Sequence, residues 1–290
     1  MRRRDEIGGW EMPRDGLDLE AARRPRVVVF DVDGVLCAQP SHPTPSGAVP
    51  EAMRVDFHHE GRSYPHVFIP HLDALLELLV AWGARVCFFS SAIPERNHAV
   101  LGEVLTRSFA PEVLAAHRRA GQFVIHSRDA LRDGDRDAGE TGNKIKDMRR
   151  VIGPGEALED VVLVEDQPSY TALGQEPCLR ALDVEFWRPG LEPDEDGWSG
   201  GGQAYRMNAA AWLLGVFDLL LHDVRYRYRP LRLGLDRLLF DLYGATRREA
   251  RRDSSHAQHG VILRGLTHLW RTRPEVVFHG RVWRPDGAWI

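Results

Sequence analysis

The sequence predicts an α/β fold built on a parallel, doubly wound β-sheet. Three continuous apolar runs are typical of strands buried on both faces, and they lie at residues 26–30 (RVVVF), 85–89 (RVCFF) and 161–164 (VVLV). Apolar residues at helical spacing predict helices at residues 72–82, 97–108 and 111–120. Buried strands that alternate with helices indicate a parallel sheet, because successive parallel strands need a long crossover connection.

A glycine turn interrupts this pattern between the first two buried runs. Residues 55–57 and 63–69 have the composition of short strands, and Gly61 lies in the polar turn that joins them. We therefore expect a small β-hairpin insertion at about residues 52–70, placed as a cap on the sheet.

The remaining segments carry weaker signals. We expect a loop rich in proline and serine at residues 39–50, short strands at 122–126 and 184–187, a charged, mobile surface loop at 128–142, a helix or its start at 144–152, and a flexible connector from 188 to 203.

The chain divides into three parts by composition. Residues 1–24 form a polar lead-in, residues 25–222 contain the predicted sheet, and residues 223–290 form a basic, mostly helical C-terminal extension. From His222 to Arg284 there are 14 arginines and 6 aspartates or glutamates, although the whole chain has a net charge of -4. The overall charge gives no general reason to expect binding to nucleic acid or to a membrane.

The cysteines and the apolar segments indicate a cytoplasmic protein. Cys37, Cys87 and Cys178 are widely spaced and odd in number, which argues against a disulfide framework and fits a reducing compartment. The N-terminus lacks the apolar core of a secretory signal. The longest apolar stretch, at residues 209–221, is too short to span a bilayer and contains Asp218, so no membrane contact is expected.

Polar residues that follow the buried runs are the candidates for function. Ligands of parallel sheets bind beyond the carboxyl ends of the strands. The residues at these positions are Asp31 and Asp33 after the first run, Ser90 and Ser91 after the second, and Glu165 and Asp166 after the third.

Asp31 and Asp33 suggest phosphoryl-transfer chemistry. Two carboxylates so close together repel each other unless a cation or a proton relieves the repulsion. Mg²⁺ prefers oxygen ligands and can bridge them to a phosphate. A carboxylate such as Asp31 can attack phosphorus to give an aspartyl-phosphate. A protonated Asp33 can supply the proton that the leaving oxygen needs and can then activate water.

A serine and a lysine complete the predicted catalytic set. The hydroxyl of Ser90, or of its neighbour Ser91, can hydrogen-bond a phosphoryl oxygen. Lys144 and Lys146 are the two lysines among 38 basic residues. Against such an arginine bias, a position that keeps lysine indicates a need for a compact ammonium group. Lys146, or alternatively Lys144, would neutralise the phosphate and keep the nucleophile ionised.

Taken in order, these four segments resemble the motifs of haloacid dehalogenase (HAD) superfamily phosphatases. DVDGVL resembles the first motif, Ser90 after RVCFF the second, Lys146-Asp147-Met148 the third and VVLVEDQP the fourth. The resemblance implies a HAD-like Rossmannoid phosphatase domain at residues 25–222 and a magnesium site. Its predicted ligands are Asp31, Asp33, Asp166 and Glu165.

The fourth motif departs from the family pattern, which has two aspartates or Asp-Asn where this chain has Glu165-Asp166. Asp166 is the expected ligand. Glu165 would then orient either a metal-bound water or Lys146.

The stretch from residue 55 to 104 is similar to one branch of that superfamily, the nuclear LIM-interacting-factor-like (NLI-interacting-factor) phosphatases. This branch includes the small phosphatases of the RNA polymerase II C-terminal domain. The similarity lies in FHHEGRSYPHVFIPHLDALL and CFFSSA, and it extends over residues 26–187. It implies a phosphorylated substrate, namely phosphoserine or phosphothreonine in a protein. The first motif departs from the branch, which has Asp-Leu-Asp-Glu-Thr-Leu.

Two alternatives follow from other features. Aromatic residues mixed with arginines at residues 226–229 and arginines at 247–252 can bind a nucleic-acid backbone, which would suit a phosphatase that processes DNA or RNA ends. Alternatively, the atypical motifs allow a catalytically inactive HAD-fold protein that binds a partner.

Overall fold

A five-stranded parallel sheet forms the centre of the molecule. The computed structural model describes residues 25–38, 54–69, 71–137, 140, 144–165, 170–175, 178–180, 199–243 and 254–273. The strand order is β10-β9-β1-β5-β6. The strands are β1 (Val27–Phe30), β5 (Arg85–Phe89), β6 (Phe123–His126), β9 (Val161–Glu165) and β10 (Cys178–Arg180). The α/β class and the parallel sheet predicted from the three buried runs are confirmed.

The register of the sheet brings the predicted site residues to one edge. β1 lies between β5 and β9, and Phe30 is the partner of both Phe88 and Val164. The chain therefore leaves each of these three strands at nearly the same level. As a result, the polar residues that follow them begin close together.

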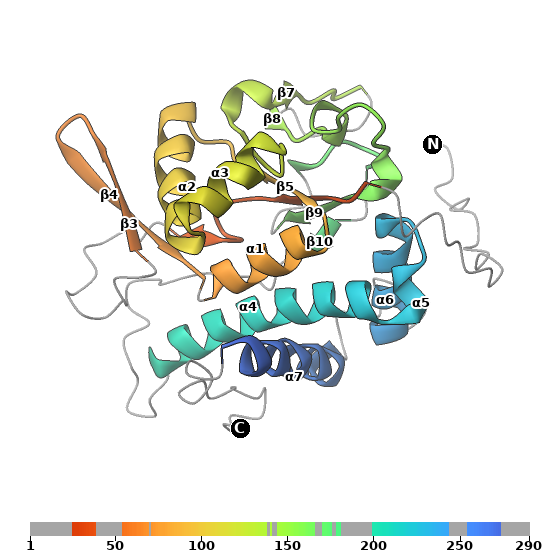
Figure 1. Cartoon of the computed structure of the whole chain (residues 1–290). Coiled ribbons are helices and arrows are strands. Elements are labelled where there is room, and N and C mark those ends of the chain that lie inside the picture. Colours follow the sequence, from red (N-terminus) through yellow and green to blue (C-terminus); the bar gives the residue numbers. More distant parts are fainter. Residues whose placement is uncertain are drawn as a thin grey trace.

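Helices cover one face of this sheet. α1 (Leu72–Ala81), α2 (Pro94–Ser108) and α3 (Pro111–Arg119) confirm the three predicted helices. Proline occupies the first turn of α2 and of α3, where its missing N–H costs no helical hydrogen bond. Figure 1 shows α1 lying along the sheet with α4 (Ser199–His222) beside it.

The opposite face is covered by short 3-10 turns. Val29, Cys87 and Phe89 pack there against Leu131 and Met148. The turns span Arg128–Ala130, Met148–Arg150 and Leu158–Asp160.

The helix expected at residues 144–152 is not formed as an α-helix. Lys144–Ile145 is strand β8, which pairs with β7 (Arg132–Asp133), and a single 3-10 turn follows it. Asp147 begins that turn by accepting the backbone N–H of Arg149 at 3.0 Å. The turn stops at Val151, just before Gly153-Pro154, so no α-helix can extend. The described part of the predicted loop at 128–142 is likewise structured, since it contains β7.

The predicted hairpin is present. β3 (Arg54–His59) and β4 (Arg62–Phe68) pair antiparallel, and Glu60 and Gly61 both have positive φ, as the type I′ hairpin turn requires. Figure 1 shows this hairpin projecting from one end of the molecule. Its base is joined to the segment after β1, because β2 (Cys37–Ala38) pairs with Val67 and Phe68 of β4.

Several sequence predictions fall on residues outside the described ranges. These are the lead-in at 1–24, the loop at 39–50, the strand at 184–187 and most of the connector at 188–203. The last part of that connector, however, is helical, because α4 begins at Ser199. The glycines at residues 200–202 disfavour helix, and for that reason a flexible connector was wrongly predicted there.

The C-terminal helices share one apolar core with the sheet. They are α4, α5 (Val224–Arg227), α6 (Leu231–Tyr243) and α7 (Ser254–Thr272). The ring of Phe217 in α4 contacts Phe30 of β1 edge-on, with centroids 6.2 Å apart, and Leu235 and Leu269 are fully buried in the same cluster. Residues on both sides of the division predicted between residues 222 and 223 therefore belong to one apolar core. In the described residues, no helix is long and apolar enough to cross a membrane.

Glycines allow α4 and α7 to pack with their backbones in contact. A Cβ at Gly265 of α7 would overlap the carbonyl oxygen of Ala211 in α4, and one at Gly215 of α4 would overlap that of Val261 in α7. Each helix thus places a small residue against the backbone of the other.

We expect Gly265→Ala to destabilise the protein by at least about 2 kcal/mol, because the new methyl group forces the two helices apart. Gly260→Ala is the matched control, since a Cβ at Gly260 in the same helix meets no atom within 4 Å. Because alanine favours helix, the control should be unchanged or up to about 1 kcal/mol more stable. Urea unfolding measures both, and equal stabilities would contradict the close packing.

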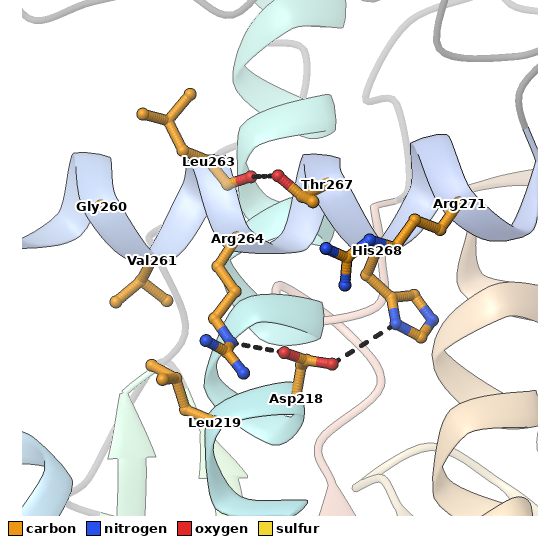
Figure 2. Close-up of a pocket in the computed structure, with 9 residues that line it drawn as sticks. All are labelled: Asp218, Leu219, Gly260, Val261, Leu263, Arg264, Thr267, His268 and Arg271. Carbon is orange, nitrogen blue, oxygen red and sulfur yellow. Dashed lines mark hydrogen bonds and ion pairs between the residues drawn. The ribbon is translucent and has the colours of Figure 1, made fainter. Parts of the chain in front are cut away.

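A buried carboxylate joins the same two helices on their polar side. Asp218 of α4 pairs with Arg264 of α7, lies 3.6 Å from Nδ1 of His268 and 2.9 Å from Nδ1 of His222. Figure 2 shows Asp218 between Arg264 and His268. These three residues help to line a pocket of about 500 Å³, whose lining includes none of the predicted site residues. Burial alone would raise the pKa of Asp218, but His268 and Arg264 outweigh it and lower the pKa to about 2.

We expect Asp218→Asn to cost about 2 kcal/mol at pH 7, because the carboxylate is more acidic in the folded protein than its ordinary 3.8. A lowered pKa stabilises the fold above about pH 4, and this contribution disappears as the pH falls toward 2. The wild type and the variant should therefore differ in unfolding free energy at pH 7, and the difference should shrink below about pH 4 and be smallest near pH 2. A difference that does not change with pH would contradict the ion pairs.

Candidate active site

The segment after β1 forms a tight turn that presents two aspartates. The N–H of Asp31 bonds to the carbonyl of Val164 on β9 at 2.9 Å, so Asp31 still lies in the plane of the sheet. The N–H groups of Leu36 and Cys37 return to the carbonyl of Val32 at 3.0 and 2.9 Å. Gly34 has a φ of 85°, which a residue with a side chain rarely adopts, and this allows the turn to close.

Lys146 lies between the carboxylates of Asp31 and Glu165. Its Nζ is 2.6 Å from Asp31 Oδ1 and 2.5 Å from Glu165 Oε2. All three residues are buried, with exposures of 4%, 7% and 1% for Lys146, Asp31 and Glu165. Burial lowers the pKa of Lys146, but the two carboxylates outweigh it and raise that pKa, so the ammonium is retained. Burial raises the pKa of Asp31, although Lys146 opposes this shift.

The backbone holds Lys146 in place. Its N–H bonds to the carbonyl of Tyr170 at 2.7 Å and its carbonyl accepts from the N–H of Ala172 at 3.0 Å. The next residue, Asp147, accepts hydrogen bonds from Arg132 at 3.0 Å and from Gln175. Burial would raise the pKa of Asp147, but these donors and Arg149 hold it well below its ordinary value. Lys144, by contrast, is exposed and pairs with Asp133 at 2.8 Å, so Lys146 is the lysine that reaches Asp31.

Asp33 lies beside Asp31 in sequence but contacts different partners. Its Oδ2 accepts from Ser90 Oγ at 2.9 Å and from Arg96 Nη1 at 3.0 Å, and its Oδ1 pairs with Arg96 Nη2. The side chain of Asp33 is 42% exposed, whereas Arg96 is buried. Ser90 is fully buried and Ser91 is exposed, so Ser90 is the serine that faces the site.

Arg96 was not among the predicted site residues. It lies in the first turn of α2, on the same helical face as Val100 and Val104, which are buried. A cation in line with an apolar stripe is unusual, because a buried charge needs a partner. That position in the stripe is the sequence signal that could have identified Arg96.

The predicted metal ligands do not gather within the described residues. Asp31 faces Lys146, Asp33 faces Arg96, and Glu165 contacts Lys146. No group of three His, Cys, Asp or Glu side chains in the described ranges is placed to hold a metal ion. Asp166 lies outside those ranges, so the fit of magnesium depends on that residue.

Comparison with known proteins gives little beyond this geometry. No protein-family model and no curated protein matches the chain. A solved structure of the fission yeast RNA polymerase II C-terminal-domain phosphatase Fcp1, bound to beryllium fluoride, aligns at 14% identity and a TM-score of 0.34, covering 89% of this chain and 68% of that one. A second structure of Fcp1 aligns at 15% identity and a TM-score of 0.33, covering 86% and 71%. Values this low assign neither a family nor an activity.

We expect Lys146→Met to cost about 3 kcal/mol or more, because it leaves the buried carboxylates of Asp31 and Glu165 without a counter-charge. Adding Glu165→Gln should recover part of that loss, so the two substitutions should be coupled by about 1–3 kcal/mol. Lys144→Met is the matched control and should change stability by less than about 0.5 kcal/mol. Chemical unfolding of the four variants tests this, and strictly additive losses would contradict the buried ion pair.

Proposed function

We propose that the chain is a magnesium-dependent phosphomonoester hydrolase that works through an aspartyl-phosphate on Asp31. The observation that carries the proposal is the buried Asp31 carboxylate at the end of the central strand, 2.6 Å from the ammonium of Lys146. A carboxylate fixed beside a cation is suited to attack a phosphoryl group, whose negative oxygens the same cation can stabilise.

Each neighbour has a role in this reaction. Lys146 keeps Asp31 ionised and neutralises charge on the phosphoryl oxygens, while Glu165 holds Lys146 in position. Ser90 lies at the end of β5 and orients Asp33 at 2.9 Å through its hydroxyl. Asp33, in its protonated form, gives its proton to the leaving oxygen, and the carboxylate that results later accepts a proton from the water that attacks the aspartyl-phosphate.

Asp31, Asp33 and Asp166 would hold magnesium, which would supply positive charge that screens the phosphate from these carboxylates. Asp33 is 42% exposed, so the site opens to solvent on the side where a leaving group departs. This exposure and the small hairpin insertion suit a large phosphorylated substrate such as a phosphoserine- or phosphothreonine-containing protein. The nucleic-acid and non-catalytic alternatives stay predictions, and no contact among the described residues favours either.

We expect the wild type to hydrolyse p-nitrophenyl phosphate when Mg²⁺ is added, and we expect hydrolysis to stop when the metal is chelated. Asp31→Asn and Lys146→Met should each lower kcat by more than about 1,000-fold, and Asp33→Asn by about 100- to 10,000-fold. Lys144→Met makes the same substitution two residues away and should leave the rate unchanged.

Circular dichroism must show that each variant is folded. Equal rates for the wild type and Asp31→Asn would remove the nucleophile. A folded wild type without metal-dependent hydrolysis would instead favour the non-catalytic binding protein.

A further inference from the structure

We propose that Arg96 is a positioning residue that fixes the direction of the Asp33 carboxyl group, and that His66 of the hairpin holds Arg96 in place. The proposal rests on the proposed function, because it concerns the proton-transfer group of that reaction. Asp33, whose side chain is 42% exposed, pairs through both oxygens with the guanidinium of Arg96, a residue that is itself 4% exposed.

The hydrogen-bond donors of Arg96 are fully used. A guanidinium carries five N–H groups. Nε donates to His66 Nε2 at 2.9 Å, Nη1 donates to Asp33 Oδ2 at 3.0 Å and to Asn97 Oδ1 at 2.9 Å, and Nη2 donates to Asp33 Oδ1 and, at 3.9 Å, to the Cys37 sulfur. Five donors thus meet five acceptors. Arg96 has no donor left for a phosphate, which distinguishes it from an arginine that binds substrate.

His66 anchors the far side of the guanidinium. It is fully buried in β4, and burial, followed by the charge of Arg96, lowers its pKa to about 4. The imidazole is therefore neutral near pH 7 and can accept the Nε–H of Arg96. Asn97, which accepts from Arg96, is itself held in place because its Nδ2 donates to Ser127 Oγ at 2.9 Å.

These contacts connect the hairpin to the catalytic turn. β4 contributes His66 to Arg96, and two residues later Phe68 pairs with Cys37, which lies at the end of that turn. Asp33 thus contacts Arg96 of α2, which the hairpin holds through His66, whereas Asp31 contacts Lys146, which also pairs with Glu165 of β9. The two carboxylates are therefore paired with separate buried cations.

The test uses the dependence of the rate on the leaving group. An alkyl phosphate, such as a phosphoserine peptide, needs its leaving oxygen protonated more than p-nitrophenyl phosphate does. We expect Arg96→Gln to lower kcat/KM for the phosphoserine peptide about 10-fold more than for p-nitrophenyl phosphate, and Arg96→Lys to restore part of the difference. Arg119→Gln, in the exposed last turn of α3, is the control and should lower neither.

A double variant separates positioning from a general loss of structure. Arg96→Gln added to Asp33→Asn should lower the phosphoserine-peptide rate by less than about 2-fold further, because the group that Arg96 positions is already gone. An equal loss on both substrates, or a full additional loss in the double variant, would overturn the proposal.

A stability measurement keeps the proposal independent of turnover. Asp33→Asn and Arg96→Gln should be coupled in the free energy of unfolding, and His66→Gln should be coupled to Arg96→Gln in the same way. If the couplings are present but the wild type shows no hydrolysis, the proposed function fails, while the inferred hold of Arg96 on the Asp33 carboxyl group stands. If Asp31→Asn is inactive and the couplings are absent, the proposed function stands and only the positioning of Asp33 by Arg96 is wrong.

Discussion

The ammonium group of Lys146 is the charge on which the candidate site depends. Asp31 and Glu165 are both buried at the end of the sheet, where water cannot compensate two negative charges. Lys146 lies within 2.6 Å of each and neutralises that repulsion. A lysine suits this place because its charge is compact, whereas a guanidinium is larger and presents its donors in a planar fork. The burial of Asp31 is therefore tolerated as long as Lys146 is there.

The charges around the site are arranged in two groups. Asp31 and Glu165 share Lys146, while Asp33 is paired with Arg96. Three carboxylates and two cations leave one negative charge when all are ionised. A phosphate dianion adds two more, so electrostatics favours its entry together with a divalent cation. This balance gives a physical reason to expect the proposed metal dependence, separate from any resemblance in sequence.

Much of the fold could be predicted from local patterns, because each pattern reports a local constraint. The runs that became β1, β5 and β9 are apolar on both faces, and their register brings Asp31, Ser90 and Glu165, which were predicted from sequence as candidates, to one edge of the sheet. Gly61 likewise marked the hairpin. In these places the local preference and the tertiary structure agree.

The failures come from longer-range causes. Arg96 was missed because its pairing with Asp33 depends on the rotation of α2 about its axis, which an isolated helix does not fix. The helix predicted at 144–152 is wrong, because β8 pairs with β7 and the backbone of Lys146 bonds to Tyr170 and Ala172, which are far from it in sequence. α4 begins in a glycine-rich stretch that local propensity disfavours. A helix that buries Phe217 against β1 overrides that propensity.

The meeting of α4 and α7 has a consequence for how the chain tolerates changes in length. Because Gly265 lies against Ala211 and Gly215 against Val261, the two helices fit in a single register. Sliding α7 by one turn would place Leu269 where Gly265 is, and a leucine side chain cannot occupy space filled by backbone. An insertion or deletion before α7 must therefore be absorbed by the preceding connection. Natural variation in length should accumulate there and leave the spacing within each helix unchanged.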